Sequence, residues 1–186
     1  MPLSVRLFWW RGIPIHGHIT LVVGLGLASR LAFRPLAWVA LLLIVFIHEL
    51  GHAFLLRRYG IPVLSITLHG FGGECESPDL HMSVWQRSVV AWGGVGAQAA
   101  LFCVTSALAE LGLFAKSAVA AQFLVDLSAF NVATVVVNLL PFGGLDGRLA
   151  WRLPWFAFRR AQHAWLRSRI VRIRSREERA RREDLH

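Results

Sequence analysis

The chain has 186 residues, of which 55% are hydrophobic and 17% are charged, and its formal net charge at pH 7 is +9. A soluble domain carries about 25% charged residues, so this composition does not fit a soluble domain and is typical of a membrane protein. The length suggests one domain. Cys75 and Cys103 lie in different segments without a Cys-x-x-Cys spacing, which argues against a disulfide framework and favours buried or reduced thiols.

The N-terminal segment, residues 1–11, carries Trp9 and Trp10 beside arginines, a pattern that suits a membrane interface. An apolar run follows from about Ile15 to Phe33, and we expect it to be the first membrane span. A secretory signal peptide is the competing interpretation. The run is long, starts late and lacks a convincing cleavage site, so a retained span is favoured.

The apolar stretch from Leu36 to Leu56 is long enough as a helix, about 30 Å at 1.5 Å per residue, to cross a bilayer. Near its C-terminal end it carries His48, Glu49 and His52. The two histidines are one turn apart and share a helix face, so both imidazoles can reach one point. In this His-Glu-x-x-His arrangement two histidines bind zinc and the glutamate acts as general base.

A bland interpretation of these three residues is open as well. They could be polar side chains at a helix end that neighbours or lipid headgroups satisfy. Polar groups inside a membrane cost several kcal/mol and usually mark a functional site, so we favour the metal site.

Between about Ile61 and Glu76 polar and apolar residues alternate, which predicts strands. Glycines that include Gly72 and Gly73 punctuate a turn, so we expect a β-hairpin beside the membrane. Its unpaired edge could receive an extended peptide by strand addition, which makes the two glycines candidate substrate contacts. A structural cap with no substrate role is the alternative.

Two further spans are expected, from about Val84 to Leu113 and from about Ser117 to Leu140. In the first of these, small residues four apart favour close helix packing, and Gln98 is expected to hydrogen-bond between helices. In the second, Asp126 lies far from the end where the chemistry is expected, so we predict that it pairs between helices.

The fourth span should break at Pro141, after Asn138 and before Asp146. Four spans would put both termini and the C-terminal ends of the second and fourth spans on one side. That side carries most of the arginines, which predicts a cytoplasmic location. A catalytic zinc takes three protein ligands, so Asp146, at the matching depth, is the best third ligand for one zinc ion per chain. Asn138 could donate a hydrogen bond to the substrate backbone or to the developing oxyanion.

From Arg148 onward the chain holds twelve of its twenty basic residues. We divide it into a membrane-embedded domain, 1–154, and a basic tail, 155–186, in which apolar residues recur at near-helical spacing. This pattern predicts an amphipathic helix on anionic lipids, with a solvated or frayed end over 174–184. Nucleic-acid binding is not expected, because no recognition motif accompanies the charge. The predicted fold class is therefore an all-α multi-pass membrane protein with about four transmembrane helices, a small membrane-associated β-hairpin and a basic C-terminal helix.

Two motifs in this order resemble those of the site-2 protease family of intramembrane zinc metalloproteases: His48-Glu49-Leu50-Gly51-His52 and Asn138-x-x-Pro141-x-x-x-x-Asp146-Gly147. The stretch around Gly72 and Gly73 is similar to the membrane-associated β region of that family. The form without an inserted PDZ-like or nucleotide-sensing CBS domain is expected. The resemblance implies that His48, His52 and Asp146 are the metal ligands. It also implies that Glu49 is the catalytic residue and that Asn138 helps to hold the substrate.

The resemblance implies an intramembrane endopeptidase that cuts a transmembrane helix of a single-pass substrate in the cell membrane. The third span departs from the Gly-Pro and Asn pattern common in the family, because Gly94, Val95 and Gln98 stand there, so no substrate contact is transferred to it. One alternative is a catalytically silent scaffold of the same fold that binds membrane-protein clients. Loss of Glu49 or of a ligand would have indicated it, and neither is lost. Another is a membrane-anchored module that works through its basic tail.

Overall fold

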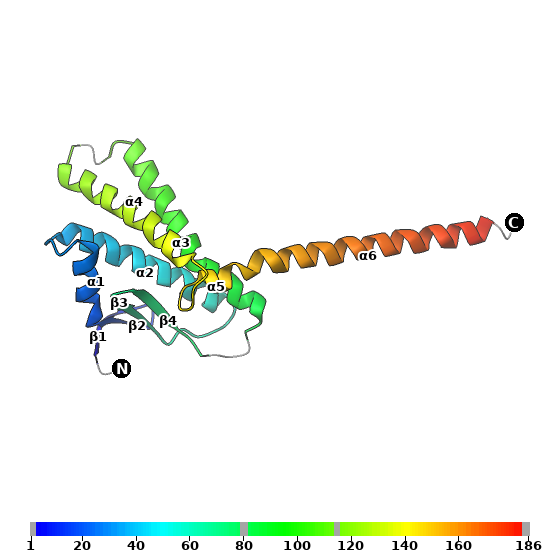
Figure 1. Ribbon diagram of the computed structural model, residues 1–186, viewed down its shortest axis with the longest axis horizontal. Helices are drawn as coiled ribbons and strands as arrows, with labels where there is room; N and C mark the ends of the chain where they lie inside the picture. The colour runs from blue at the N-terminus through cyan, green and yellow to red at the C-terminus, as the bar shows by residue number, and fades with distance from the viewer. Residues whose placement is uncertain (1–2, 79–81, 114–115, 184–186) are drawn as a thin grey trace.

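The computed structural model describes residues 3–78, 82–113 and 116–183. A small sheet packs against a group of long helices, and one helix extends away from the rest (Figure 1). The elements in chain order are β1 (Ser4–Trp10), β2 (Ile13–His18), α1 (Thr20–Ala28), α2 (Pro35–Arg58), β3 (Ser65–His69), β4 (Gly72–Glu76), α3 (Val84–Glu110), α4 (Ala118–Asn138), α5 (Gly147–Ala150) and α6 (Arg152–Glu183).

The sheet has the strand order β1-β2-β3-β4, so β4 forms one edge. β3 and β4 pair antiparallel, with His69 opposite Gly72 and Ser65 opposite Glu76, which confirms the predicted hairpin. β1 and β2 form a second antiparallel pair, and β2 joins β3 in parallel. The predicted hairpin is therefore one half of a larger mixed sheet.

The predicted first span from Ile15 to Phe33 is wrong. Its first residues belong to β2, and the helix that follows, α1, has nine residues. A helix of that length measures about 14 Å, less than half of a bilayer core of about 30 Å. The strand forms because Ile13 and Ile15 alternate along it and are buried against Ile66 of β3 and Ala53 of α2, in a core that a lipid-facing helix would not have.

Three helices of the described chain are long and apolar enough to cross a membrane, and these are α2, α3 and α4. They correspond to the second, third and fourth predicted spans, so the structure has three such helices where the sequence predicted about four. The side of the membrane on which the N-terminus lies was predicted by counting four spans, so that argument no longer holds. The cytoplasmic location of both termini and of the active-site end stays a prediction.

Helix α2 lies between the sheet and the hairpin formed by α3 and α4 (Figure 1). Gly51 of α2 and Gly93 of α3 allow a close approach of the two helices, because a Cβ on Gly51 would collide with the carbonyl of Gly93. On the α4 side, Ala40 and Ile44 pack with Leu127 in a buried cluster. These contacts fix the faces of α2 that meet its neighbours.

Asp126 of α4 pairs between elements, as predicted. Its two carboxylate oxygens accept hydrogen bonds from Nη2 of Arg34, just before α2, at 3.0 Å and 3.2 Å. Gln122 Nε2 donates to the same carboxylate at 3.0 Å. A buried charge is stabilised by such a partner, so this aspartate has a structural explanation without catalysis.

Near its start, helix α6 contacts the body, where the guanidinium of Arg160 lies 5.1 Å from the ring centre of Trp85 in α3. Beyond that point it extends away from the other elements (Figure 1). Its predicted contact with anionic lipids and the division at residue 155 stay predictions, and the last residues of the tail, 184–186, lie outside the described chain.

Candidate metal centre

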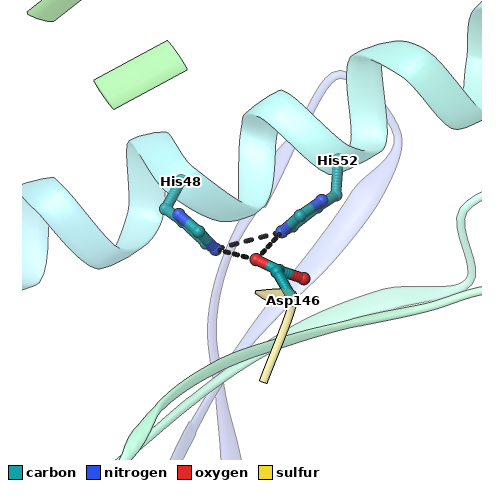
Figure 2. A group of neighbouring side chains, drawn as sticks. All are labelled: His48, His52 and Asp146. Carbon is teal, nitrogen blue, oxygen red and sulfur yellow. Dashed lines mark hydrogen bonds and ion pairs between the residues drawn. The ribbon is translucent and has the colours of Figure 1, made fainter. Parts of the chain in front are cut away.

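Two histidines of α2 and an aspartate just before α5 converge on one point (Figure 2). The Nε2 atoms of His48 and His52 are 3.0 Å apart, and Oδ2 of Asp146 lies 2.8 Å from the first and 3.1 Å from the second. Among the described residues, these three form a group of possible ligands whose atoms all lie within 4.8 Å of one another. The convergence predicted for residues 98 positions apart is therefore present.

The chain after α4 is shaped so that Asp146 returns to α2. Gly144 has a φ of +89°, a left-handed conformation that favours glycine. Gly147 lies so close to the carbonyl of Leu139 that a Cβ would collide with it. The indole of Trp151 donates to that same carbonyl at 2.7 Å, which closes the loop. The helix break predicted from Pro141 is thus part of a tight return.

In its neutral form, the imidazole of His52 presents Nε2 to the site without a proton. Its other ring nitrogen, Nδ1, lies 2.8 Å from the backbone carbonyl of Val90, which can only accept a hydrogen bond. Nδ1 therefore donates, and Nε2 keeps its lone pair as a metal ligand does.

The carboxyl of Asp146 faces the same nitrogen. A lone pair on His52 and a carboxylate oxygen thus lie 3.1 Å apart, an arrangement that a cation stabilises. The ligands of a tetrahedral zinc ion lie about 3.3 Å apart, so the three residues fit zinc with little movement.

Glu49 lies next to the group, on the same helix, and is 4% exposed. Its side chain passes beneath Gly73 of β4, where a Cβ would come within 2.6 Å of Oε1. A cavity of about 910 Å³ is lined by this carboxyl, by the three candidate ligands and by the edge strand β4. The group is therefore open to a molecule as large as a peptide segment.

The three predicted substrate contacts, Asn138, Gly72 and Gly73, all line this cavity. The side-chain nitrogen of Asn138 lies 3.5 Å from Nε2 of His48. Their roles toward a substrate stay predictions. His69 and Glu74 line the cavity as well, but neither belongs to the ligand group.

Sequence reasoning missed how helix α3 supports the histidines. Gly94 lies against the ring of His48, and a Cβ there would collide with it. Val90 contributes through its carbonyl, for which the sequence holds no signal. The interhelical hydrogen bonding predicted for Gln98 is confirmed, since its side chain contacts both His48 and Thr134.

No family model matches the chain. Curated relatives do match. A putative zinc metalloprotease of Synechocystis sp. is 33% identical over 159 residues, which cover 79% of this chain and 40% of that protein. A zinc metalloprotease of Methanocaldococcus jannaschii is 35% identical over 79 residues, 39% of this chain and 23% of that protein. A putative zinc metalloprotease of Mycolicibacterium smegmatis is 29% identical over 150 residues, 61% of this chain and 58% of that protein. The chain thus spans less than two thirds of the length of these relatives.

A solved structure, the site-2 protease from Methanocaldococcus jannaschii, is similar with a TM-score of 0.58 and 26% identity, over 80% of this chain and 70% of that one. Span-length helices, a small sheet and a group of two histidines and an aspartate that could hold a metal ion are the features of a multi-pass membrane protein with a candidate metal site. Together with the two motifs, these matches support the resemblance to the site-2 protease family.

Proposed function

We propose that the chain is an intramembrane zinc endopeptidase that hydrolyses peptide bonds in or near transmembrane helices of membrane-protein substrates. One observation carries this proposal: the candidate ligands and the buried carboxyl of Glu49 meet in one cavity beside span-length helices. A site of that kind has both the donors for zinc and a base next to them.

His48, His52 and Asp146 would hold the zinc ion through Nε2, Nε2 and Oδ2. A bound zinc ion activates water near neutral pH and polarises a peptide carbonyl. Glu49 accepts the proton from the attacking water and delivers it to the leaving amine as the peptide bond breaks. Asn138, whose amide lies 3.5 Å from His48, donates a hydrogen bond to the carbonyl oxygen of the substrate as negative charge develops there.

A substrate helix must unwind before attack, because its backbone groups are hydrogen-bonded to one another. The edge strand β4 offers an unwound segment a backbone to pair with. Gly73 lies directly over Glu49, so a peptide added to this edge passes beside the base. Neither Gly72 nor Gly73 has a side chain to obstruct it. We propose that these two residues hold the substrate in extended form.

The test uses purified protein in liposomes with a tagged single-span substrate. The wild type should release two fragments, and Glu49→Gln should release none while it retains zinc. A Glu49→Gln variant that cuts at the wild-type rate would count against the proposal. So would a wild-type protein that binds no zinc.

The silent scaffold is not favoured, because the carboxyl and all three candidate ligands are present and converge. The scaffold alternative predicts that client proteins bind equally well to the wild type and to Glu49→Gln, and that neither protein cuts them. The tail-based binding module predicts that truncation of α6 abolishes function while Glu49→Gln leaves it intact.

A further inference from the structure

A chain of hydrogen bonds runs from the candidate metal centre across three helices. Nδ1 of His48 in α2 lies 2.9 Å from Oε1 of Gln98 in α3. The amide nitrogen of Gln98 donates to Oγ1 of Thr134 in α4 at 2.6 Å. Gln98 is fully buried, so water does not compete for either end of its amide.

Which group donates in each of these hydrogen bonds can be worked out from Thr134, at the end of the chain away from the metal centre. Oγ1 of Thr134 lies 2.8 Å from the carbonyl of Phe130 and 3.1 Å from that of Asn131. Carbonyls only accept, so the single hydroxyl proton of Thr134 points to them. Its oxygen can then only accept from Gln98, which turns the amide nitrogen toward Thr134.

The amide oxygen of Gln98 must consequently face His48. An amide oxygen is an acceptor only, so Nδ1 of His48 carries the proton. A neutral imidazole has one N–H, which leaves Nε2 of His48 with a free lone pair toward Asp146. The reversed amide would require the hydroxyl proton of Thr134 to leave both backbone carbonyls, and it would move the imidazole proton to Nε2.

We propose that Gln98 and Thr134 are positioning residues of the metal site, which hold His48 in the tautomer whose Nε2 is ready to bind the ion. The inference rests on the proposed function only in that the site binds zinc. Neither residue touches the ion or the scissile bond in this scheme. The backbone of Gln98 is itself fixed, because the side chain of Asn131 donates to its carbonyl at 2.9 Å.

The first experiment measures zinc affinity of the purified protein by competition with a chelating dye. Gln98→Met keeps the length of the side chain but replaces the amide oxygen that faces Nδ1 of His48 with a thioether, which is only a weak acceptor. Loss of a partner behind a ligating histidine weakens metal binding by about 10–100-fold, and we expect a loss of that size. Gln98→Glu keeps an acceptor there and should bind zinc at least as tightly as the wild type.

The second experiment separates the tautomer effect from packing. Thr134→Val removes the acceptor that orients the amide and should weaken zinc binding by about tenfold, whereas Thr134→Ser should not. In a Gln98→Glu background, Thr134→Val should have little effect, because a carboxylate has an acceptor at both ends. A loss caused only by altered packing would be equal in the two backgrounds.

Thr105→Val is the matched control. Thr105 is a buried threonine of α3 whose hydroxyl donates to Phe102 of its own helix, and its removal should leave the zinc affinity unchanged. The visible spectrum of the cobalt-substituted protein gives a second readout, which should change in Gln98→Met and not in Thr105→Val.

Wild-type affinity in both Gln98→Met and Thr134→Val would overturn the inference while leaving the proposed function standing. If Gln98→Met does not fold, the Thr134→Val and Thr134→Ser pair decides in the same way. Equal losses from Thr134→Val in the two backgrounds would also overturn it. Absence of zinc from the wild type would instead refute the proposed function.

Discussion

The contact between Gly73 and Glu49 makes a single glycine decisive for the proposed chemistry. A Cβ at residue 73 would lie 2.6 Å from Oε1 of Glu49, and the flexible carboxyl is the group that can move away. Gly73→Ala should therefore fold normally and still displace the base. A misplacement of about 1 Å can cost about 100-fold in rate, and we expect kcat to fall by about 10–100-fold.

The check is a rate measurement on a single-span substrate together with the zinc content. Gly96→Ala is the control, because a Cβ at that helical glycine has no heavy atom within 4 Å. Wild-type activity in Gly73→Ala, or the loss of its zinc, would contradict this account of the contact.

Part of the site could be predicted from the sequence. Helix periodicity alone puts His48 and His52 on one face. Asp146 follows from the expectation that the C-terminal ends of α2 and α4 lie at the same depth in the membrane. The supporting contacts could not be predicted, because the partner of His48 depends on how α3 and α4 are rotated about their axes. Gln98 was expected to bond between helices, but nothing in the sequence chose His48 and Thr134 as its partners.

At the scale of elements, the edge strand β4 is expected to pair with the substrate in extended form. A segment with low helix propensity reaches this edge at lower cost, because its helical form is less stable. Substrates with glycine or proline near the scissile bond should therefore be cut faster than substrates with alanine there, at equal hydrophobicity. A series of single-span substrates with graded helix propensity tests this, and equal rates across the series would contradict it.

The same scale shows where hydropathy misleads. Residues 13–33 are apolar enough to suggest a span, yet the first part forms β2 because Ile13 and Ile15 find a buried core against Ile66. An apolar strand in such a core and a lipid-facing helix have similar composition, so only tertiary packing separates them. The hairpin of β3 and β4 was predictable because its alternation and glycines are local signals.

At the scale of the whole molecule, three crossings by α2, α3 and α4 would put the C-terminal ends of α2 and α4 on one side of the membrane, together with α6. Arginines cluster there, including Arg57 and Arg58, so we predict that this side is cytoplasmic. A cysteine-free variant with Glu183→Cys should react with an impermeant thiol reagent only in opened cells. Lys116→Cys should react in intact cells, and the reverse pattern would contradict the predicted orientation.

The basic helix α6 is expected to meet anionic lipids. Arginines alternate with exposed aromatic residues along its described side chains, including Trp155, Phe158 and Trp165. Phosphatidylglycerol in the liposome should slow tryptic cleavage of this helix by several-fold relative to neutral lipid, and high salt should remove the difference. Equal cleavage in both liposomes would show that the helix stays in solution.

The most direct test of the central claim is the zinc content of two purified proteins. One carries Asp146→Ala, and the other keeps His48, His52 and Asp146. Both proteins should carry Glu49→Gln so that self-cleavage does not interfere. The account predicts one zinc ion per chain when His48, His52 and Asp146 are intact, and near-complete loss of zinc after dialysis in Asp146→Ala. Full retention of zinc by Asp146→Ala would contradict the claim that these distant residues hold the metal together.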